Sequence, residues 1–261
     1  MRVRIRTLVA GSNRPIQGWV MREPLAQLIE RTFSAADREV IYRLMRSRRD
    51  IHQFAPDPIP TDALLRVLDA AHQAPSVGFM QPWNFILITS PPVRAHIKAL
   101  FEEINAGEVD DVPGTERQRL YRSLKPEGLL ESPMNIAVTC DRRRGDPFVL
   151  GRTPVPDTDI YSTCLAIQNM WLAACAEGLG IGWVSILDYA RVERLLGLPS
   201  GVRLIAYLCI GFPREFRLRP MLEEVGWRER LPLHGLVFKD AWGQTCELLA
   251  AAAAPADDDG R

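Results

Sequence analysis

Hydrophobic residues recur at the spacing of an amphipathic helix in four parts of the chain. The helices that this pattern predicts cover residues 37–46, 61–74, 93–104 and 157–177. Thr61 is in position to cap the second helix, and Pro75 ends it, because proline cannot continue a helix. The fourth helix is apolar on nearly every side, which is typical of a central, buried helix.

Compact runs of apolar and β-favouring residues predict four strands among these helices. They cover residues 83–89, 134–140, 183–187 and 203–210. Strands that alternate with helices indicate an α/β or α+β class. Neither an internal repeat nor a low-complexity linker divides the chain. We therefore expect a single folded domain, covering residues 35–246.

Three segments lie outside this pattern. Residues 105–132 are polar, charge-mixed and poor in core positions, which is typical of a lid over a ligand site. Residues 1–34 are rich in arginine but lack the continuous apolar run of a secretory signal, so we expect a flexible leader, with Met21 as a candidate start. Residues 247–261 have little to bury and are predicted to be disordered.

The composition excludes several classes of function. Of 261 residues, 47% are hydrophobic, and 32 basic side chains balance 32 acidic ones, so no overall field favours nucleic acid or membrane. No apolar run approaches the ~18 residues of a membrane span. The five cysteines form no C-x-x-C pair and the four histidines have no metal-ligand spacing. We expect a cytoplasmic protein without structural disulfides or a bound metal.

The stretch Ser47-Arg48-Arg49-Asp50-Ile51-His52-Gln53-Phe54 carries the strongest candidate chemistry. Two adjacent guanidinium groups suit a dianionic phosphate, because each binds it with two charge-assisted hydrogen bonds. A carboxylate beside them repels the same ligand, so Asp50 is better suited to chemistry than to affinity. The alternative is an ordinary helix end, where arginines complement the helix dipole. Taken alone, this stretch favours the alternative.

The glycine run Gly178-Leu179-Gly180-Ile181-Gly182 does not predict a dinucleotide site. A Rossmann glycine loop follows a strand and opens a helix, whereas this run closes a helix and leads into a strand. We interpret these glycines as helix-cap and turn residues. Ser185, in the apolar run that follows, would ordinarily bond a neighbouring backbone group.

Taken in order along the chain, the motifs resemble the FMN-dependent nitroreductase family over about residues 37–213. The matching motifs are Arg48-Arg49, Ala74-Pro75-Ser76, Gln81-Pro82-Trp83-Asn84-Phe85, Gln168-Asn169-Met170, Gly178-Leu179-Gly180 and Gly211-Phe212-Pro213. The resemblance implies an α+β fold with a central, mostly antiparallel sheet flanked by helices. It also implies an intertwined homodimer with flavin at the interface.

Asp50 narrows the resemblance, since ordinary nitroreductases usually have serine after the paired arginines. The chain is similar to the branch of the family that fragments reduced FMN to 5,6-dimethylbenzimidazole, the lower ligand of vitamin B12, and erythrose 4-phosphate, with dioxygen as co-substrate. The further matching motifs are Leu124-Lys125-Pro126-Glu127-Gly128, Glu131-Ser132-Pro133, Trp183-Val184-Ser185-Ile186, Gly226-Trp227-Arg228 and Leu231-Pro232-Leu233. His52 departs from the arginine that is common in relatives, and Pro126 departs from leucine.

The resemblance implies roles for particular residues. Asp50 is the expected base near the first ribityl carbon, and Ser185 the expected hydrogen-bond donor near the flavin ring. The other implied flavin-binding residues are Arg48, Arg49 and His52 at the phosphate end, Ser76, Met80 and Gln81 from the facing subunit, Leu124 in the lid, and Gly182, Trp183 and Val184 at the ring edge. Arg214, Arg217 or Arg219 is expected to complete the phosphate site.

Two other functions stay open from the sequence. One is an NAD(P)H-dependent nitroreductase or dehalogenase-like reductase that retains its FMN, and Asp50 together with the lid motif argues against it. The other is a non-catalytic flavin-binding protein, against which both arginines, Asp50 and Ser185 argue. For the fragmenting enzyme, the candidate source of reduced FMN is a separate flavin reductase that uses NAD(P)H.

Overall fold

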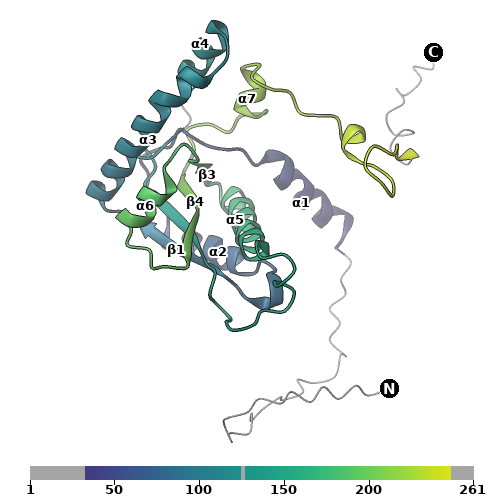
Figure 1. Cartoon of the computed structure of the whole chain (residues 1–261). Coiled ribbons are helices and arrows are strands. Elements are labelled where there is room, and N and C mark those ends of the chain that lie inside the picture. Colours follow the sequence, from purple (N-terminus) through teal and green to yellow (C-terminus); the bar gives the residue numbers. More distant parts are fainter. Residues whose placement is uncertain (1–32, 125–126, 248–261) are drawn as a thin grey trace, which may run out of the picture. The chain divides into compact units, whose positions relative to one another are not determined.

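The centre of the fold is an antiparallel sheet built from the most continuous apolar runs of the chain. The computed structural model describes residues 33–124 and 127–247. The strands are β1 (Trp83–Ile88), β2 (Met134–Asp141), β3 (Gly180–Trp183) and β4 (Val202–Gly211). They lie in the order β1-β2-β4-β3, and every ladder between them is antiparallel (Figure 1). The mostly antiparallel sheet expected from the family resemblance is therefore confirmed.

Helices flank the sheet and connect its strands. The α-helices are α1 (Ala35–Ser47), α2 (Thr61–His72), α3 (Pro91–Asp111), α4 (Thr115–Ser123), α5 (Thr158–Ala176), α6 (Tyr189–Leu195) and α7 (Met221–Glu224). Single 3₁₀ turns lie at Val77–Phe79 and Leu233–Leu236. The α+β class is confirmed by this arrangement.

The two central strands send side chains to both faces of the sheet, because successive residues of a strand point in opposite directions. Ile136 and Leu208 pack on one face with α2 and α5. Ala137 and Tyr207 pack on the other face with α3 and α6. Both faces are covered by helices, and this explains why β2 and β4 are almost continuously apolar.

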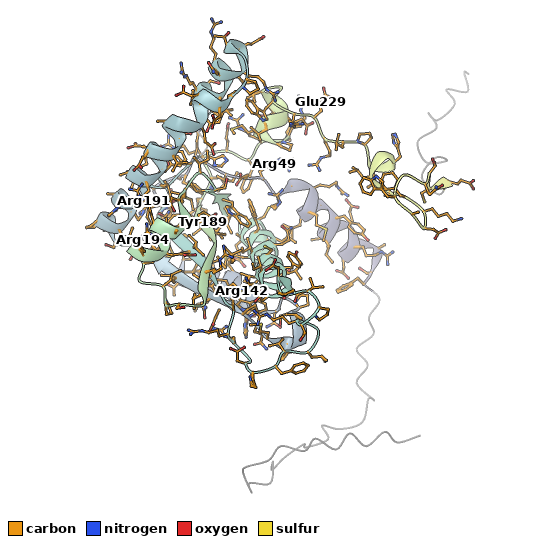
Figure 2. All side chains as sticks on the ribbon, viewed as in Figure 1. Arg49, Arg142, Tyr189, Arg191, Arg194 and Glu229 are labelled. Carbon is orange, nitrogen blue, oxygen red and sulfur yellow. The ribbon has the colours of Figure 1, made fainter. Side chains whose placement is uncertain are left out.

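Ion pairing supports the layer that holds α3 and α6. The Asp188 carboxylate caps α6 by accepting a hydrogen bond from the Arg191 N–H at 3.1 Å. The Arg191 side chain then pairs with Glu103 of α3 at 2.7 Å. Figure 2 shows Arg191 and Arg194 on α6, well away from Arg49.

The first, second and fourth predicted strands match β1, β2 and β4 to within one residue at each end. The third prediction, a strand over residues 183–187, was wrong in position. β3 ends at Trp183. After a last hydrogen bond from the Val184 N–H to β4, the chain turns, and the Leu187 N–H donates to the Ser185 carbonyl at 2.8 Å. The apolar run continues past the strand because Val184 and Leu187 still face the core.

Two of the predicted helices need correction at their ends. Pro60, not Thr61, occupies the N-cap position of α2, and it supplies no side-chain cap. The helix predicted over residues 93–104 is α3, which continues to Asp111 because Val109 returns to the core at 8% exposure. The segment expected as a lid therefore consists largely of the end of α3 and of α4.

α5 was expected to be buried on nearly every side, and this was wrong for the described part of the chain. Ala166, Ile167 and Met170 are buried against the rest of the fold. Tyr161 and Leu165, on another face, are 58% and 47% exposed. Exposed apolar side chains gathered on one helix face are typical of a protein–protein contact.

Several expectations fall outside the described residues. Nearly all of the predicted leader and of the predicted tail lies there, and so do Lys125 and Pro126 of the lid motif. Within the part of the chain that the structure describes, no helix is both long and apolar enough to cross a membrane.

Candidate active site

The segment that follows α1 lies directly against β3. Asp50 and Ile181 form a parallel bridge, and the Ile51 N–H donates to the Ile181 carbonyl at 3.0 Å. Ile51 is 6% exposed and belongs to the core that covers one face of the sheet. This pairing brings the motif Arg48-Arg49-Asp50 to the edge of the sheet.

Two glycines of β3 make this close approach possible. A Cβ atom on Gly180 would lie 2.6 Å from a side-chain carbon of Ile51, and one on Gly182 would lie 2.1 Å from the Ile51 carbonyl oxygen. Gly178, with φ of +74°, ends α5 as predicted. Gly180 and Gly182 therefore act as contact residues rather than turn residues, because only a residue without a side chain fits there.

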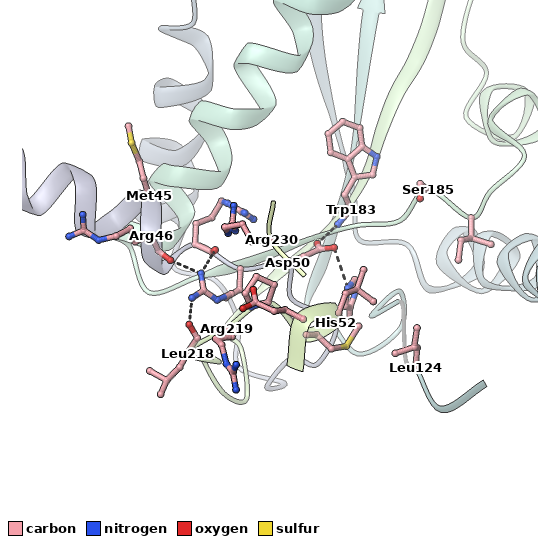
Figure 3. Close-up of a pocket in the computed structure, with 17 residues that line it drawn as sticks. Met45, Arg46, Asp50, His52, Leu124, Trp183, Ser185, Leu218, Arg219 and Arg230 are labelled. Carbon is pink, nitrogen blue, oxygen red and sulfur yellow. Dashed lines mark hydrogen bonds and ion pairs between the residues drawn. The ribbon is translucent and has the colours of Figure 1, made fainter. Parts of the chain in front are cut away.

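Both carboxylate oxygens of Asp50 are held. Oδ1 accepts a hydrogen bond from the Trp183 N–H at 3.0 Å, and Oδ2 lies 3.3 Å from His52 Nε2 (Figure 3). The Asp50 side chain is 45% exposed, whereas that of His52 is 11% exposed. A carboxylate has about four lone-pair positions. Asp50 thus keeps acceptor capacity on the side that is open.

That open side is a cavity of about 740 Å³. Most of the predicted site residues line it: Arg48, Arg49, Asp50, His52, Leu124, Trp183, Ser185 and Arg219. Figure 3 shows Arg219 and Arg230 on one side of Asp50, and Ser185 and Leu124 on the other. The cavity therefore has a cationic end and a less charged end, with the carboxylate between them.

The paired arginines have different surroundings. The Arg49 guanidinium donates to the carbonyls of Arg46 and Arg48, at 2.6 and 2.8 Å, and to the carbonyl of Leu218. Arg48 lies over the Trp171 ring at 4.8 Å, and its guanidinium donates to no oxygen of a described residue. Burial lowers the pKa of Arg48, while the nearby Asp50 carboxylate raises it. Arg48 thus presents free donors, and Arg49 fixes the chain around Leu218.

One wall of the cavity comes from the segment after β4. Met221, Leu222 and Glu223 of α7 line the cavity, and so does Arg230. The same segment contacts α4, since the Arg117 guanidinium lies 4.6 Å from the centre of the Trp227 ring. Because Leu124 directly follows α4, this contact links the two walls on either side of the cavity.

Ser76, Met80 and Gln81 are not brought to this cavity. The Ser76 hydroxyl accepts a hydrogen bond from the Gln81 N–H at 3.0 Å, which fixes the turn between them. Met80 and Gln81 line a separate groove of about 540 Å³, together with His72 and Trp83. Their predicted origin in a facing subunit stays a prediction.

Other predicted residues contribute backbone rather than side chains. Gly182 lies beneath Ile51, as described above, and the buried Val184 donates its N–H to the Tyr207 carbonyl at 2.9 Å. Arg214 does not line the cavity. Its Nε donates to the Phe54 carbonyl at 3.0 Å, which holds the segment after β4 against residues 53–54.

The α7 wall and Arg230 were missed by residue-by-residue reasoning. The cluster of Arg214, Arg217 and Arg219 pointed to this segment, but α7 is one short turn without a helical pattern of its own. Arg217 pairs with Glu215 and Glu224 at 2.9 and 2.7 Å, so these carboxylates neutralise its charge, and it does not line the cavity that contains Asp50.

In the described residues, no group of three His, Cys, Asp or Glu side chains could hold a metal ion.

Comparison with known proteins gives the family. The sequence profile of the Nitroreductase family matches residues 45–212. This chain belongs to the nitroreductase family. The matched range begins in α1 and ends just after β4, so it includes the sheet and the Arg48-Arg49-Asp50 motif. The α7 wall lies beyond it.

Two relatives extend the match along most of the chain. A 5,6-dimethylbenzimidazole synthase of Rhodospirillum rubrum is 42% identical over 200 residues, which are 77% of this chain and 94% of that protein. A 5,6-dimethylbenzimidazole synthase of Rhodobacter capsulatus is 39% identical over 200 residues, covering 77% of this chain and 96% of that protein.

Solved structures share the fold of this nitroreductase-family chain. An iodotyrosine deiodinase bound to FMN and 3-iodo-L-tyrosine superposes with a TM-score of 0.58 at 24% identity, over 68% of this chain and 91% of that one. The NADPH:FMN oxidoreductase of Vibrio harveyi, complexed with NAD+, gives a TM-score of 0.57 at 19% identity, over 81% and 82%. At these identities the likeness concerns the fold alone.

Proposed function

We propose that this protein is a 5,6-dimethylbenzimidazole synthase. It uses dioxygen to fragment reduced FMN, giving 5,6-dimethylbenzimidazole and erythrose 4-phosphate. The observation that carries the proposal is the position of Asp50. Its carboxylate accepts a hydrogen bond from the Trp183 N–H and lies between the cationic end and the less charged end of one cavity. The synthases of Rhodospirillum rubrum and Rhodobacter capsulatus, 42% and 39% identical over 200 residues, support it.

The residues that are present fit FMN. The cavity of about 740 Å³ lies within the range of roughly 300–1,000 Å³ that is usual for small-molecule sites. Arg48 has free donors, and Arg219 and Arg230 line the same cavity, which suits a dianionic phosphate. Trp183 and Leu124 supply apolar surface for a ring. When bound, reduced FMN supplies the electrons that dioxygen accepts.

Each of five residues that line the cavity then has a defined task. Arg48 and Arg230 hold the phosphate, and Asp50 takes the proton from the first ribityl carbon. Ser185 donates a hydrogen bond near the ring, and Leu124 with α4 limits the access of water. A closed site suits this reaction, because bulk water would compete with the fixed hydrogen bonds.

A second copy of the chain is part of the proposal. The exposed Tyr161 and Leu165 on α5 give a copy an apolar surface to cover. Met80 and Gln81 line a groove other than the Asp50 cavity, so a facing copy would bring them to the flavin. The enzyme is thus a homodimer with flavin at the interface.

Substitution of Leu165 by glutamate is expected to dissociate this dimer, because it introduces a charge into an apolar contact. Sedimentation velocity of the purified chain measures the change, and the dimer dissociation constant should rise at least about tenfold. Leu87→Glu, at a residue of similar exposure on β1 (43% against 47%), is the control and should stay dimeric. A wild-type chain that sediments as a monomer at micromolar concentration contradicts the proposal.

The reducing equivalents come from outside the cavity under this proposal. FMN is the substrate that this cavity would hold and consume, so each turnover needs a new molecule of reduced FMN. A separate flavin reductase that uses NAD(P)H would therefore deliver reduced FMN.

One experiment tests the function directly. The purified protein is mixed with chemically reduced FMN in air, and the products are identified by chromatography and mass spectrometry. Loss of flavin with formation of 5,6-dimethylbenzimidazole is the expected result. Full recovery of oxidised FMN contradicts it, and turnover of nitroaromatics with NADPH would then identify a reductase.

Replacement of Arg48 by methionine is expected to weaken FMN binding about 10- to 100-fold, because a hydrogen bond to a charged group contributes roughly 1.5–3 kcal/mol. Quenching of flavin fluorescence on titration measures the dissociation constant. Arg194→Met on α6, which is exposed and distant from Arg49 in Figure 2, is the matched control and should bind like the wild type. Equal affinities of the two variants would remove Arg48 from the phosphate site.

A further inference from the structure

His52 is a buried histidine whose two ring nitrogens have different surroundings. Nε2 lies 3.3 Å from Asp50 Oδ2, and the side chain is 11% exposed. Nδ1 is buried without a hydrogen-bond partner among the described residues. It lies close to the backbone of β3, since a Cβ atom on Gly182 would be 3.5 Å from it.

These surroundings decide which nitrogen of a neutral imidazole carries the proton. A proton on Nδ1 would be a buried donor without an acceptor, and the lone pair of Nε2 would face the carboxylate. A proton on Nε2 instead forms a charge-assisted hydrogen bond with Oδ2. The second arrangement is favoured, and in it Nδ1 is left only as an unpaired acceptor.

Asp50 is then restrained from two sides. The Trp183 N–H holds Oδ1 at 3.0 Å, and the imidazole holds Oδ2. Trp183 belongs to β3, whereas His52 belongs to the segment that lies against β3. Two donors from different segments fix the plane of the carboxylate, and a base needs such a fixed orientation to meet one carbon-bound proton.

We propose that His52 is a positioning residue for Asp50: its Nε2–H orients the carboxylate toward the open cavity. The proposal rests on the proposed function in one respect, because it takes Asp50 as the base of that reaction. The contact between the two side chains does not depend on the function, so it has a test of its own.

The kinetic test uses two amides that place a donor at different distances from the backbone. The amide nitrogen of glutamine is as many bonds from Cα as Nε2, and that of asparagine as many as Nδ1. His52→Asn is expected to lower kcat for 5,6-dimethylbenzimidazole formation roughly 10- to 100-fold, with KM for reduced FMN changed less than about threefold. His52→Gln should recover most of the rate.

The second test needs no substrate. Long-range ¹H–¹⁵N spectra of the full-length protein should show the His52 ring with its proton on Nε2, and the resonance is assigned by its loss in His52→Gln. Asp50→Ala should shift the ring signals of His52 and speed exchange of that proton. His72, whose Nδ1 accepts from Trp83 Nε1 at 3.2 Å, is the internal reference and should not change.

The outcomes separate this proposal from the proposed function. Wild-type protein that forms no 5,6-dimethylbenzimidazole overturns the function, while the spectra still decide whether His52 bonds Asp50. Ring signals that do not respond to Asp50→Ala overturn the positioning role. A kcat for His52→Asn equal to that of the wild type, or a His52→Gln variant no better than His52→Asn, overturns it as well.

Discussion

Asp50→Asn is expected to lower the rate of 5,6-dimethylbenzimidazole formation at least about 100-fold, because removal of a general base commonly costs that much or more. Asparagine keeps the shape of the side chain, and its carbonyl oxygen can still accept the Trp183 N–H bond that Oδ1 accepts at 3.0 Å. The affinity for FMN should therefore stay within a few-fold of wild type. Single-turnover product analysis and flavin titration measure the two quantities.

The control for this substitution lies in the same cavity. Among the described residues that line it, Glu223 of α7 is the other carboxylate, so Glu223→Gln removes a carboxylate from the same surroundings. We expect Glu223→Gln to keep its rate within about threefold of the wild type. If Glu223→Gln lost the activity while Asp50→Asn kept it, the base would be Glu223.

Gly182→Ala is expected to reduce both stability and activity. Its Cβ would lie 2.1 Å from the Ile51 carbonyl oxygen, a backbone atom, so the segment that carries Asp50 must move away from β3. Overpacking of this kind costs roughly 1–3 kcal/mol of unfolding free energy. A displacement of about 1 Å at a reacting group costs roughly 100-fold in rate. Urea denaturation and the product assay measure the two effects.

Gly107→Ala is the matched control for the glycine substitution. Gly107 lies within α3, and a Cβ there meets no atom within 4 Å. Alanine in a helix interior should stabilise the protein by about 0.5–1 kcal/mol and leave the activity unchanged. A Gly182→Ala variant as stable and active as Gly107→Ala would show that the segment does not depend on close contact with β3.

The sequence predicted β1, β2 and β4 well because each is a largely apolar run with clear ends. Pro82 precedes β1, and Ser90 with two prolines follows it. β3 was placed too late, because Val184 and Leu187 prolong the apolar pattern beyond Trp183, where the strand ends. The hydrophobic pattern indicates which side chains are buried. It does not indicate which backbone N–H and C=O groups form the hydrogen bonds of a sheet.

The candidate site was also predicted in part. The order of motifs pointed to Arg48, Asp50 and Ser185, all of which line one cavity. The separate tasks of the paired arginines were not predictable, since Arg49 bonds the Leu218 carbonyl, 169 residues away in sequence. Arg230 had no pattern to mark it, because its position depends on the path of an irregular segment.

By itself, then, the sequence determined the class of the fold, the ends of its central strands and the stretch that holds the candidate base. Local pattern is enough for these, because each depends on residues that are neighbours in the chain. Only the tertiary structure decided the partners of Asp50, the contact role of Gly180 and Gly182, and the wall formed by α7. Those features arise where distant segments meet, and their geometry follows from the packing of the whole chain rather than from any one stretch.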